Sequence, residues 1–580
     1  MDGTFKGWTS GKSYGFIKPA DGSSDVFLHQ NSVDPEINLQ RHDRVSFDVT
    51  DSEKGRAALN LFRRKERSDG TDDRPVIKAF DSLHQRSLLD DNEGPNDEIE
   101  EVDTSSVSRD LLREISKWKR EAKAENNDQY FWSVKEVAQI QTGEKYFVIG
   151  RKGSGKTAIC EHFNQLRQHD VFSEKLSFKN FPFNELYSHK NQKFTTPNQY
   201  ITLWKYLIYS SVCRLMLKNE AVDSKLRTEL TKLYGDELSL SRRVGKWVAK
   251  EFGFSLFGLS TKVVKDPSVT AGDWTSYVDY LEDILLSHAG DATYFVLFDE
   301  LDEDYRDVIQ AEQYQQYTSL ITSLFKAVQD VRTTLGTNPT LRVFPVVFLR
   351  DDIYEIVQDN DKNKWGDFRV DLMWDTEKIK KVVAFRISRA LNPSASQPLP
   401  FEDAWRQVFG KGLMRMGTNG KKVSSTFEYI ARSTLLRPRD FVAYLQNCAN
   451  EAVESDQYIT PDIVKRVDKA FSNYLREELT DELFAILPDI VSIFDAISQL
   501  RKWNFSIGEL DEAYGQQIAR GIIKEGNVKF VLQILFLFSV LGNAPSHNRS
   551  VFRYQNREAR LNFNERVVVH RGLFKALQIL

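Results

Sequence analysis

The chain has 580 residues, 41% of them hydrophobic, which is enough to bury several cores and suggests about three or four domains. Its formal net charge of −4 excludes a protein that coats nucleic acid with its whole surface. Its three cysteines and nine histidines show no metal or redox spacing. We find no secretion signal or apolar run of membrane length, so we expect a cytoplasmic protein without a membrane contact.

Aromatic residues with a period of two mark the first 65 residues. Tyr14 and Phe16 lie two positions apart, and so do Phe27 and His29, so each pair shares one face of a strand and offers rings on which bases can stack. The candidate nucleic-acid contacts are Lys6, Trp8, Lys12, Tyr14, Phe16, Phe27 and His29. Ten basic against nine acidic residues in this segment predict a shallow dependence of binding on salt.

Residues 3–17 and 25–29 together resemble a cold-shock domain. The resemblance implies an all-β, five-stranded OB-fold barrel over residues 1–65 that binds single-stranded RNA or DNA. Gly7 and Gln30 stand where this family commonly has aromatic residues, which makes the stacking surface thinner. The alternative that the barrel is a protein-interaction or autoinhibitory module therefore stays open.

A polar segment follows the barrel. Eight acidic residues fall between positions 90 and 103, so residues 66–106 are predicted to form an acidic disordered linker. Residues 107–126 then read as one amphipathic helix that leads into the next domain. Its apolar stripe is expected to pack in a core and consists of Leu111, Leu112, Ile115 and Trp118.

A complete phosphate loop, G-x-x-x-x-G-K-T, follows the strand-like residues 146–149 and precedes a helical pattern. Lys156 brings a positive charge to the β- and γ-phosphates, and the hydroxyl of Thr157 can bind Mg²⁺. The backbone that would surround the phosphates comprises Gly150, Arg151, Lys152, Gly153, Ser154, Gly155, Lys156, Thr157 and Ala158. The sequence therefore predicts a site for ATP and Mg²⁺ in an α/β domain spanning residues 107–390.

A second apolar strand, residues 294–298, ends in Asp299 and Glu300. Asp299 is the candidate ligand of Mg²⁺, and Glu300 is the candidate general base that polarises the attacking water. This pairing predicts a Mg²⁺-dependent ATPase and not a nucleotide-binding protein alone. Between the two motifs we expect a helical elaboration, with helices at residues 198–218 and 239–250 and a strand or hairpin at residues 252–260.

Two later segments extend the pattern of the nucleotide site. Residues 341–349 read as the next core strand and end at Arg350, and residues 435–441, which contain Arg437 and Arg439, open a helix. Together with the two nucleotide motifs, these segments resemble P-loop ATPases with a catalytic glutamate, in the AAA+ branch that holds origin-recognition and STAND-type switch ATPases.

This resemblance implies that Arg350 is a first sensor of the γ-phosphate and that Arg437 or Arg439 is a second sensor on a helical lid, residues 391–485. Ordinary surface ion pairs are the alternative reading of these arginines. The same motifs also resemble a bacterial ATPase family that is often associated with phage defence.

The last part of the chain, residues 486–580, is predicted to be an α+β, winged-helix-like domain. Helical patterns come first, and residues 551–555 and 566–571 are expected to form a strand pair. Seven basic and two acidic residues lie between positions 545 and 575. The arginines among them could face a duplex, or they could pair with acidic surfaces of the ATPase core.

Two functions fit this modular organisation. The first is an ATP-driven switch that senses or binds nucleic acid and controls an effector protein in trans, with a homo-oligomer as one form of output. The second is a non-catalytic adaptor that binds single-stranded nucleic acid and keeps its nucleotide for structural reasons.

Overall fold

The computed structural model describes residues 2–8, 14–21, 25–29, 43–52, 55–63, 108–166, 168–179, 183, 187, 198–235, 240–248, 274–302, 311–410, 413–416, 422–546 and 549–579. The chain divides into two compact units, Met1–Phe80 and Asp81–Leu580. The predicted linker, residues 66–106, and the predicted strand at 252–260 lie outside the described residues. Among the helices that are described, none is both long and apolar enough to cross a membrane.

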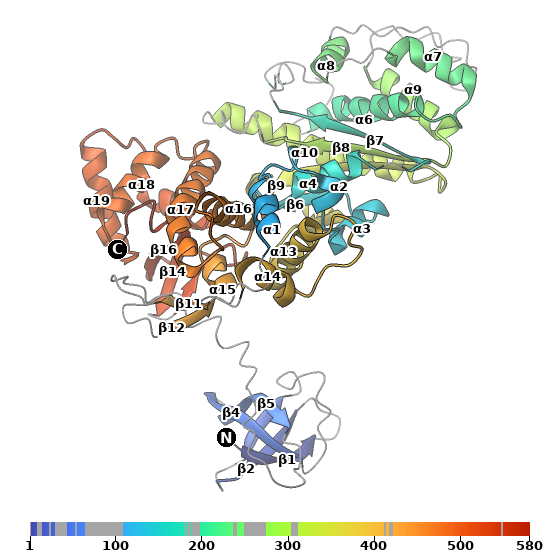
Figure 1. Cartoon of the computed structure of the whole chain (residues 1–580). Helices are drawn as coiled ribbons and strands as arrows, with labels where there is room; N and C mark the ends of the chain where they lie inside the picture. The colour runs from blue at the N-terminus through green and yellow to red at the C-terminus, as the bar shows by residue number, and fades with distance from the viewer. Residues whose placement is uncertain are drawn as a thin grey trace. The chain divides into compact units, whose positions relative to one another are not determined.

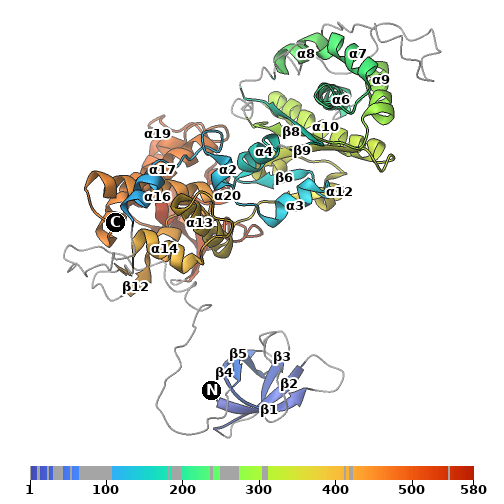
Figure 2. The same ribbon diagram turned by 45° about the vertical axis from the view of Figure 1, so that its right-hand side comes forward.

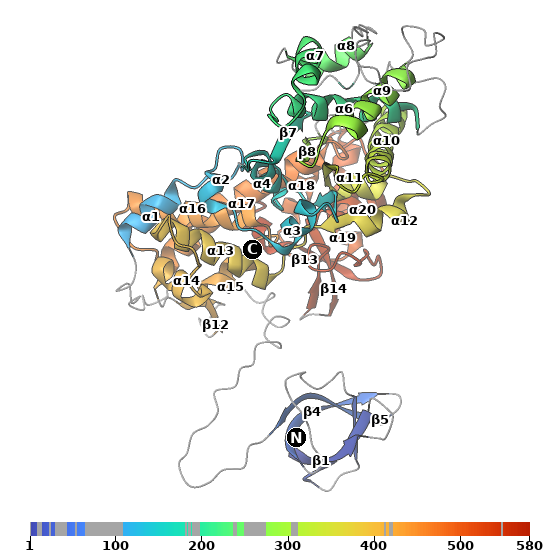
Figure 3. The same ribbon diagram turned by 90° about the vertical axis from the view of Figure 1, so that its right-hand side faces the viewer.

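The first unit is a closed barrel with strand order β1-β2-β3-β5-β4, which Figure 3 shows nearly end-on. Its strands are β1 (Asp2–Trp8), β2 (Tyr14–Pro19), β3 (Val26–His29), β4 (Arg44–Ser52) and β5 (Gly55–Arg63). Alternate residues point inward and form the core: Phe5, Ile17, Val26, Leu28, Val45 and Phe47. The predicted OB-type barrel is confirmed.

A five-stranded sheet of parallel strands, in the order β10-β6-β9-β8-β7, forms the centre of the second unit. The strands are β6 (Phe147–Gly150), β7 (Val171–Ser177), β8 (Thr293–Asp299), β9 (Arg342–Arg350) and β10 (Arg369–Asp371). Both faces are covered, since Phe295 and Leu297 of β8 pack into one core while Val296 and Phe298 pack into another. Burial on both faces explains why the inner strands β6, β8 and β9 read as apolar runs.

Helices cover the two faces of this sheet (Figures 1 and 2). One face packs against α3 (Lys135–Gln141) and α4 (Lys156–Asn164). The other packs against α6 (Ile201–Met216), α9 (Trp274–His288) and α10 (Ala311–Leu335). The predicted helices between the two nucleotide motifs are present as η3 (Asn198–Tyr200) with α6, and as α8 (Leu240–Val248), beside α7 (Ser224–Tyr234). Short elements α11 (Asp351–Ile356), α12 (Lys362–Trp365) and η5 (Gly366–Phe368) connect β9 to β10.

The helical lid and the C-terminal region share one large hydrophobic core. The lid contributes α14 (Phe401–Phe409), α15 (Thr426–Ala431), α16 (Pro438–Glu454), α17 (Pro461–Leu483) and the hairpin of β11 (Leu413–Met416) and β12 (Lys422–Ser425). The same core includes Leu111, Leu112 and Ile115 of α1 (Arg109–Ser116) and Ile379 of α13 (Thr376–Leu391). Helices α1 and α13 therefore contribute to the same core as the helices of the lid.

The helix predicted over residues 107–126 is also shorter than expected. It ends at Ser116, and residues 118–126 form a connecting segment without helix before α2 (Asn127–Tyr130). Trp118 is nevertheless buried, in agreement with the predicted apolar stripe.

The C-terminal region combines helices with a four-stranded sheet of order β13-β16-β14-β15. The elements are α18 (Ile490–Gln499), β13 (Asn504–Phe505), α19 (Ile507–Ala519), α20 (Val528–Leu537), β14 (Leu541–Ser546), β15 (Arg549–Val551), β16 (Arg566–Val569) and η6 (Arg571–Leu573). The strand pair predicted from residues 551–555 and 566–571 is wrong in its pairing. Strand β14 lies between β15 and β16 and pairs with both.

Candidate functional site: the phosphate loop and its cavity

The phosphate loop connects the end of β6 to the start of α4. Gly153 and Gly155 have φ angles of 79° and 96°, which residues with a side chain rarely adopt. A Cβ atom placed on Gly150 would lie 2.5 Å from Ser154 Oγ, whereas one on Gly155 would have no atom within 4 Å. The loop thus folds tightly on itself at Gly150 and is open at Gly155, where α4 begins and its N-terminal N–H groups favour an anion.

Groups from two other parts of the chain hold the carbonyl oxygens of this loop. Arg437 Nη1 donates to Lys152 O at 3.2 Å, and Trp374 Nε1 donates to Ser154 O at 2.8 Å. Successive peptide N–H groups in such a turn form a concave anion site when their carbonyls are bound elsewhere. The surrounding contacts therefore favour a loop that is already shaped for phosphate.

Lys156 is half-buried beside the loop. Its Nζ donates to Gly150 O at 2.8 Å and to Arg151 O at 3.0 Å. Burial lowers the pKa of Lys156, and the nearby Asp302 and Asp351 oppose that effect. The ammonium is therefore held by backbone carbonyls at the start of the loop.

A cavity of about 490 Å³ lies over the phosphate loop and the carboxyl ends of β8 and β9. This volume falls in the range of roughly 300–1,000 Å³ that is typical of ligand sites. Eleven of the residues predicted for the nucleotide site line it: Lys152, Gly153, Ser154, Gly155, Lys156, Thr157, Ala158, Asp299, Glu300, Arg350 and Arg439. Because β9 lies between β6 and β8, the two nucleotide motifs and Arg350 meet at the same edge of the sheet.

Asp299 is 3% exposed and has a cationic neighbour that the sequence pattern did not indicate. Lys175 of β7 places its Nζ 2.9 Å from Asp299 Oδ2 and 2.7 Å from Glu161 Oε1 of α4. Burial raises the pKa of Asp299, and Lys175 acts in the opposite direction. The candidate metal ligand is therefore part of a buried ion-pair network.

Glu300 is held from two sides. Lys123 Nζ donates to Glu300 Oε1 at 2.7 Å, and the Ser177 hydroxyl at the end of β7 donates to Oε2. Burial alone would raise the pKa of Glu300, but the hydrogen bonds from Lys123 and Ser177 bring it below its ordinary value. Its φ angle of 62° is unusual for a residue with a side chain, a strain that commonly accompanies a functional position.

The three candidate sensor arginines have different surroundings. Arg350 donates to both carboxylate oxygens of Asp352, at 3.0 and 2.7 Å. Arg437 is 2% exposed and pairs with Asp440 and with Glu482, the latter at 2.7 Å. Neither is an ordinary surface ion pair.

Arg439 is more accessible than Arg437. Its side chain is 25% exposed, lines the cavity and pairs with Glu478 at 3.1 Å. A Cβ on Gly153 would lie 3.3 Å from Arg439 Cβ, so the lid reaches the phosphate loop at this residue.

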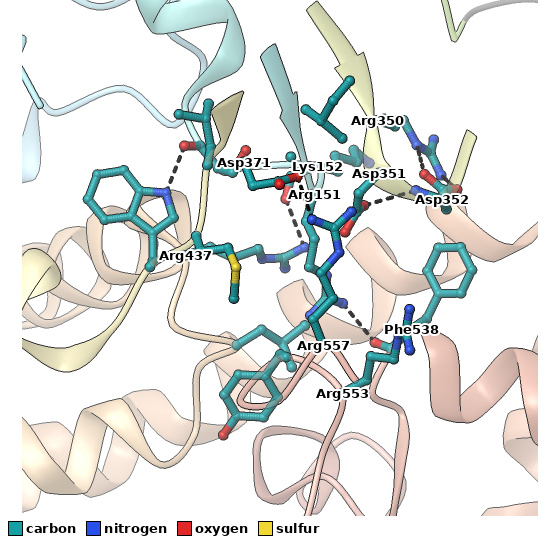
Figure 4. A pocket seen from close by; sticks show the side chains of 18 of the residues that line it. Arg151, Lys152, Arg350, Asp351, Asp352, Asp371, Arg437, Phe538, Arg553 and Arg557 are labelled. Atoms are coloured by element: carbon teal, nitrogen blue, oxygen red, sulfur yellow. Dashed lines mark hydrogen bonds and ion pairs between the residues drawn. The ribbon is translucent and has the colours of Figure 1, made fainter. Parts of the chain in front are cut away.

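A smaller pocket of about 70 Å³ lies on the opposite side of the loop, and Figure 4 shows the arginines around it. Arg151 of the loop donates to Phe538 O at the end of α20, at 3.0 Å. Arg553 pairs with Glu355 of α11, and Arg557 pairs with Asp371 of β10. Arg553 and Arg557 therefore follow the second alternative given for the C-terminal arginines, which is pairing with acidic residues of the ATPase core.

In the barrel, the cross-strand register places Tyr14 opposite His29 and Phe16 opposite Phe27. The rings of Phe16 and Phe27 lie 6.1 Å apart, and Phe16 is 38% exposed. These two aromatics share one face, as predicted.

Lys6 of β1 pairs with Asp25, which reduces its charge toward a phosphate. The side chains of Trp8, Tyr14 and His29, and the whole of Lys12, lie outside the described residues. Nowhere in the described part of the chain do three or more His, Cys, Asp or Glu residues form a metal cluster.

Comparison with known proteins gives two family matches. Residues 1–63 match the model of the 'Cold-shock' DNA-binding domain, and residues 377–480 match the FunZ-associated C-terminal helical domain. The second match coincides with α13 to α17, which supports the assignment of α13 to the lid.

Solved structures with similarity to the chain include Cdc6p from Pyrobaculum aerophilum and Drosophila ORC bound to DNA. The first is 11% identical and has a TM-score of 0.28, with 78% of this chain and 96% of that chain covered. The second is 10% identical and has a TM-score of 0.25, with 86% and 98% covered. Scores this low do not establish a shared fold.

Curated relatives match the first unit over most of their own length. Cold shock-like protein CspC of Buchnera aphidicola is 40% identical over 64 residues, which is 11% of this chain and 93% of the relative. The major cold shock protein of Micrococcus luteus is 43% identical over 63 residues, which is 10% of this chain and 94% of that protein. Through its N-terminal domain, the chain belongs to the cold-shock family.

Proposed function

We propose that this protein is a Mg²⁺-dependent ATPase that works as a switch and binds single-stranded nucleic acid through its cold-shock domain. The observation that carries the proposal is the cavity of about 490 Å³, into which the phosphate loop, Asp299, Glu300 and Arg439 all face. These residues come from the core and the lid, so a bound triphosphate would be in contact with both.

Each candidate catalytic residue of the cavity has a proposed role that its surroundings support. Lys156 and the N-terminus of α4 would bind the β- and γ-phosphates. Glu300 is ionised and can accept a proton from water, since its pKa is below the ordinary value. Arg439 would report the γ-phosphate to the lid.

The oxygen atoms of Thr157 and Asp299 fit a hard cation, but Lys175 competes with the cation for Asp299. Thr157 and Asp299 supply a hydroxyl and a carboxylate oxygen, the kind of ligand that Mg²⁺ prefers, and both line the cavity. When bound, Mg²⁺ would neutralise charge on the phosphate oxygens. Lys175 already neutralises Asp299, so Asp299 would have to exchange or share this partner.

The nucleic-acid part of the proposal rests on the barrel. Stacking on Phe16 and Phe27 does not depend on base identity, so we propose single strands without strong sequence preference and of either RNA or DNA. Control of an effector in trans, self-association and a duplex contact of the winged-helix-like region extend this proposal. A role in phage defence has only the resemblance of the motifs behind it and is not included.

The adaptor remains a second candidate because protein groups already engage the catalytic residues. Lys156 contacts loop carbonyls, Lys175 contacts Asp299, and Lys123 contacts Glu300. A site whose catalytic residues are already paired in this way could bind nucleotide without hydrolysing it.

The two candidates differ in turnover and in coupling. The test measures ATP hydrolysis with and without Mg²⁺, single-stranded RNA, single-stranded DNA and duplex. It also measures nucleic-acid affinity with an ATP analogue, with ADP and without nucleotide in the Glu300→Gln background. For a switch, we expect the nucleotide state to change affinity by roughly 5- to 150-fold. Turnover at background level together with identical affinities would contradict the switch and leave the adaptor.

A further inference from the structure

The connecting segment, residues 118–126, precedes the ATPase core in sequence but is attached to the lid. Gln446 Nε2 of α16 donates to Trp118 O at 2.8 Å, and Arg120 Nε donates back to Gln446 Oε1 at 3.0 Å. The preceding helix α1 packs directly on α16. Movement of α16 would therefore carry this segment with it.

A second anchor ties the segment to α13. Glu125 pairs with Arg386 of α13 and also accepts hydrogen bonds from the backbone N–H groups of Lys119 and Asn126, each at 3.1 Å. The guanidinium of Arg386 lies 4.5 Å from the ring of Trp118. Both ends of the segment are thus fixed to helices of the lid.

Between these anchors the chain makes a turn, in which Ala124 N–H donates to Glu121 O at 3.0 Å. The turn presents Lys123, whose Nζ lies 2.7 Å from Glu300 Oε1. Glu300 is therefore bound on one carboxylate oxygen by the lid, through Lys123, and on the other by the core, through Ser177.

We infer that Lys123 is a positioning residue through which the lid holds the carboxylate of Glu300 and restrains ATP hydrolysis. The inference rests on the proposed ATPase activity and adds its regulation. A carboxylate bound to both Lys123 and Ser177 has fewer lone pairs available to accept a proton from water. Displacement of the lid, by nucleotide or by a partner, would withdraw Lys123 and leave Glu300 bound by Ser177 alone.

The test compares Lys123→Ala, Lys123→Arg and wild-type full-length protein. Lys123→Ala should raise ATP turnover in the absence of nucleic acid by roughly two- to fivefold, the size of effect that a partly exposed ion pair supports. The increase should appear in kcat and leave KM for ATP unchanged, because Lys123 contacts the carboxylate of Glu300. Lys123→Arg should restore the wild-type kcat.

Lys117→Ala is the matched control, since Lys117 precedes the segment, does not line the cavity and pairs with Glu114 at the surface. It should match wild type in kcat and in KM for ATP. If wild type is active and Lys123→Ala has the same turnover, the inference is contradicted but the proposed function is not. The same holds if Lys123→Ala has lower turnover, a result that would make Lys123 a phosphate ligand. A wild type without ATP turnover contradicts the proposed function and the inference with it.

Discussion

Arg437 of the lid and Lys152 of the phosphate loop are 285 positions apart in sequence and joined by a hydrogen bond of 3.2 Å from the Arg437 guanidinium to the Lys152 carbonyl. The same guanidinium is buried between Asp440 and Glu482. Its contacts with the nucleotide site are therefore structural, while Arg439, the other candidate sensor of the lid, lines the cavity.

Arg437→Ala should destabilise the fold strongly. It removes the counter-charge of two buried carboxylates, a change that typically costs about 3–5 kcal/mol. The measurement is urea unfolding followed by circular dichroism. Arg439→Ala is the matched comparison, because its ion pair with Glu478 is partly exposed and should contribute about 1 kcal/mol or less. Equal losses in the two variants would show that Arg437 is not the buried anchor described here.

Lys156→Ala and Glu300→Gln should separate binding from hydrolysis. The first removes the charge that faces the phosphates and should abolish tight nucleotide binding. The second keeps the shape of the side chain and should leave binding intact while it slows turnover by about 10²-fold or more. Binding is followed with a fluorescent ATP analogue and turnover by phosphate release. If Glu300→Gln hydrolyses ATP at the wild-type rate, Glu300 is not the general base.

His570 should make stability depend on pH. Its imidazole is 1% exposed, and burial, followed by the charges of Arg151 and Arg437, lowers its pKa to about 3. The unfolded chain has the ordinary value of about 6.5, so between pH 6.5 and 3 it binds a proton that the folded chain does not. Stability must therefore fall as pH decreases through this window.

The contribution of His570 is isolated by comparison with His570→Gln, which keeps a hydrogen-bond acceptor for Gly572 N–H. Between pH 7 and pH 5, the free energy of unfolding of the wild type should fall by about 2 kcal/mol more than that of the variant. Urea unfolding at the two pH values gives the difference. A constant difference would mean that His570 has the same pKa in the folded and unfolded protein.

The cold-shock domain should bind single strands by stacking. In a fragment of residues 1–65, Phe16→Ala or Phe27→Ala should each cost about 1–3 kcal/mol of binding free energy. Lys6→Ala should cost less, because Asp25 already pairs with Lys6. Fluorescence titration with single-stranded and duplex oligonucleotides at several salt concentrations provides the values. The absence of binding to any oligonucleotide at low salt would favour the protein-interaction alternative.

The parts of the site that are local in sequence could be predicted from it. The loop from Gly150 to Thr157 and the strand that ends in Asp299 and Glu300 each consist of neighbouring residues with a characteristic pattern. Aromatic alternation likewise placed Phe16 and Phe27 on one face of the barrel.

The partners of these residues could not be predicted, because they come from elements distant in sequence. Lys175 reaches Asp299 only because β7 pairs with β8, and Lys123 reaches Glu300 only because α1 packs on the lid. In the sequence, Lys123 lies among alternating charges that look like any solvated surface. A short apolar helix such as α1 likewise gives no sign in the sequence of which core it joins.

The phosphate loop is held by the core through Trp374, by the lid through Arg437 and by the C-terminal region through the bond of Arg151 to Phe538. Its eight-residue motif is therefore not a module that can be moved alone. Grafting the loop onto another parallel sheet would transfer every residue of the signature, but neither Trp374 nor Arg437, which donate to the carbonyls of Ser154 and Lys152. The shape of the proposed triphosphate site thus depends on all three regions together.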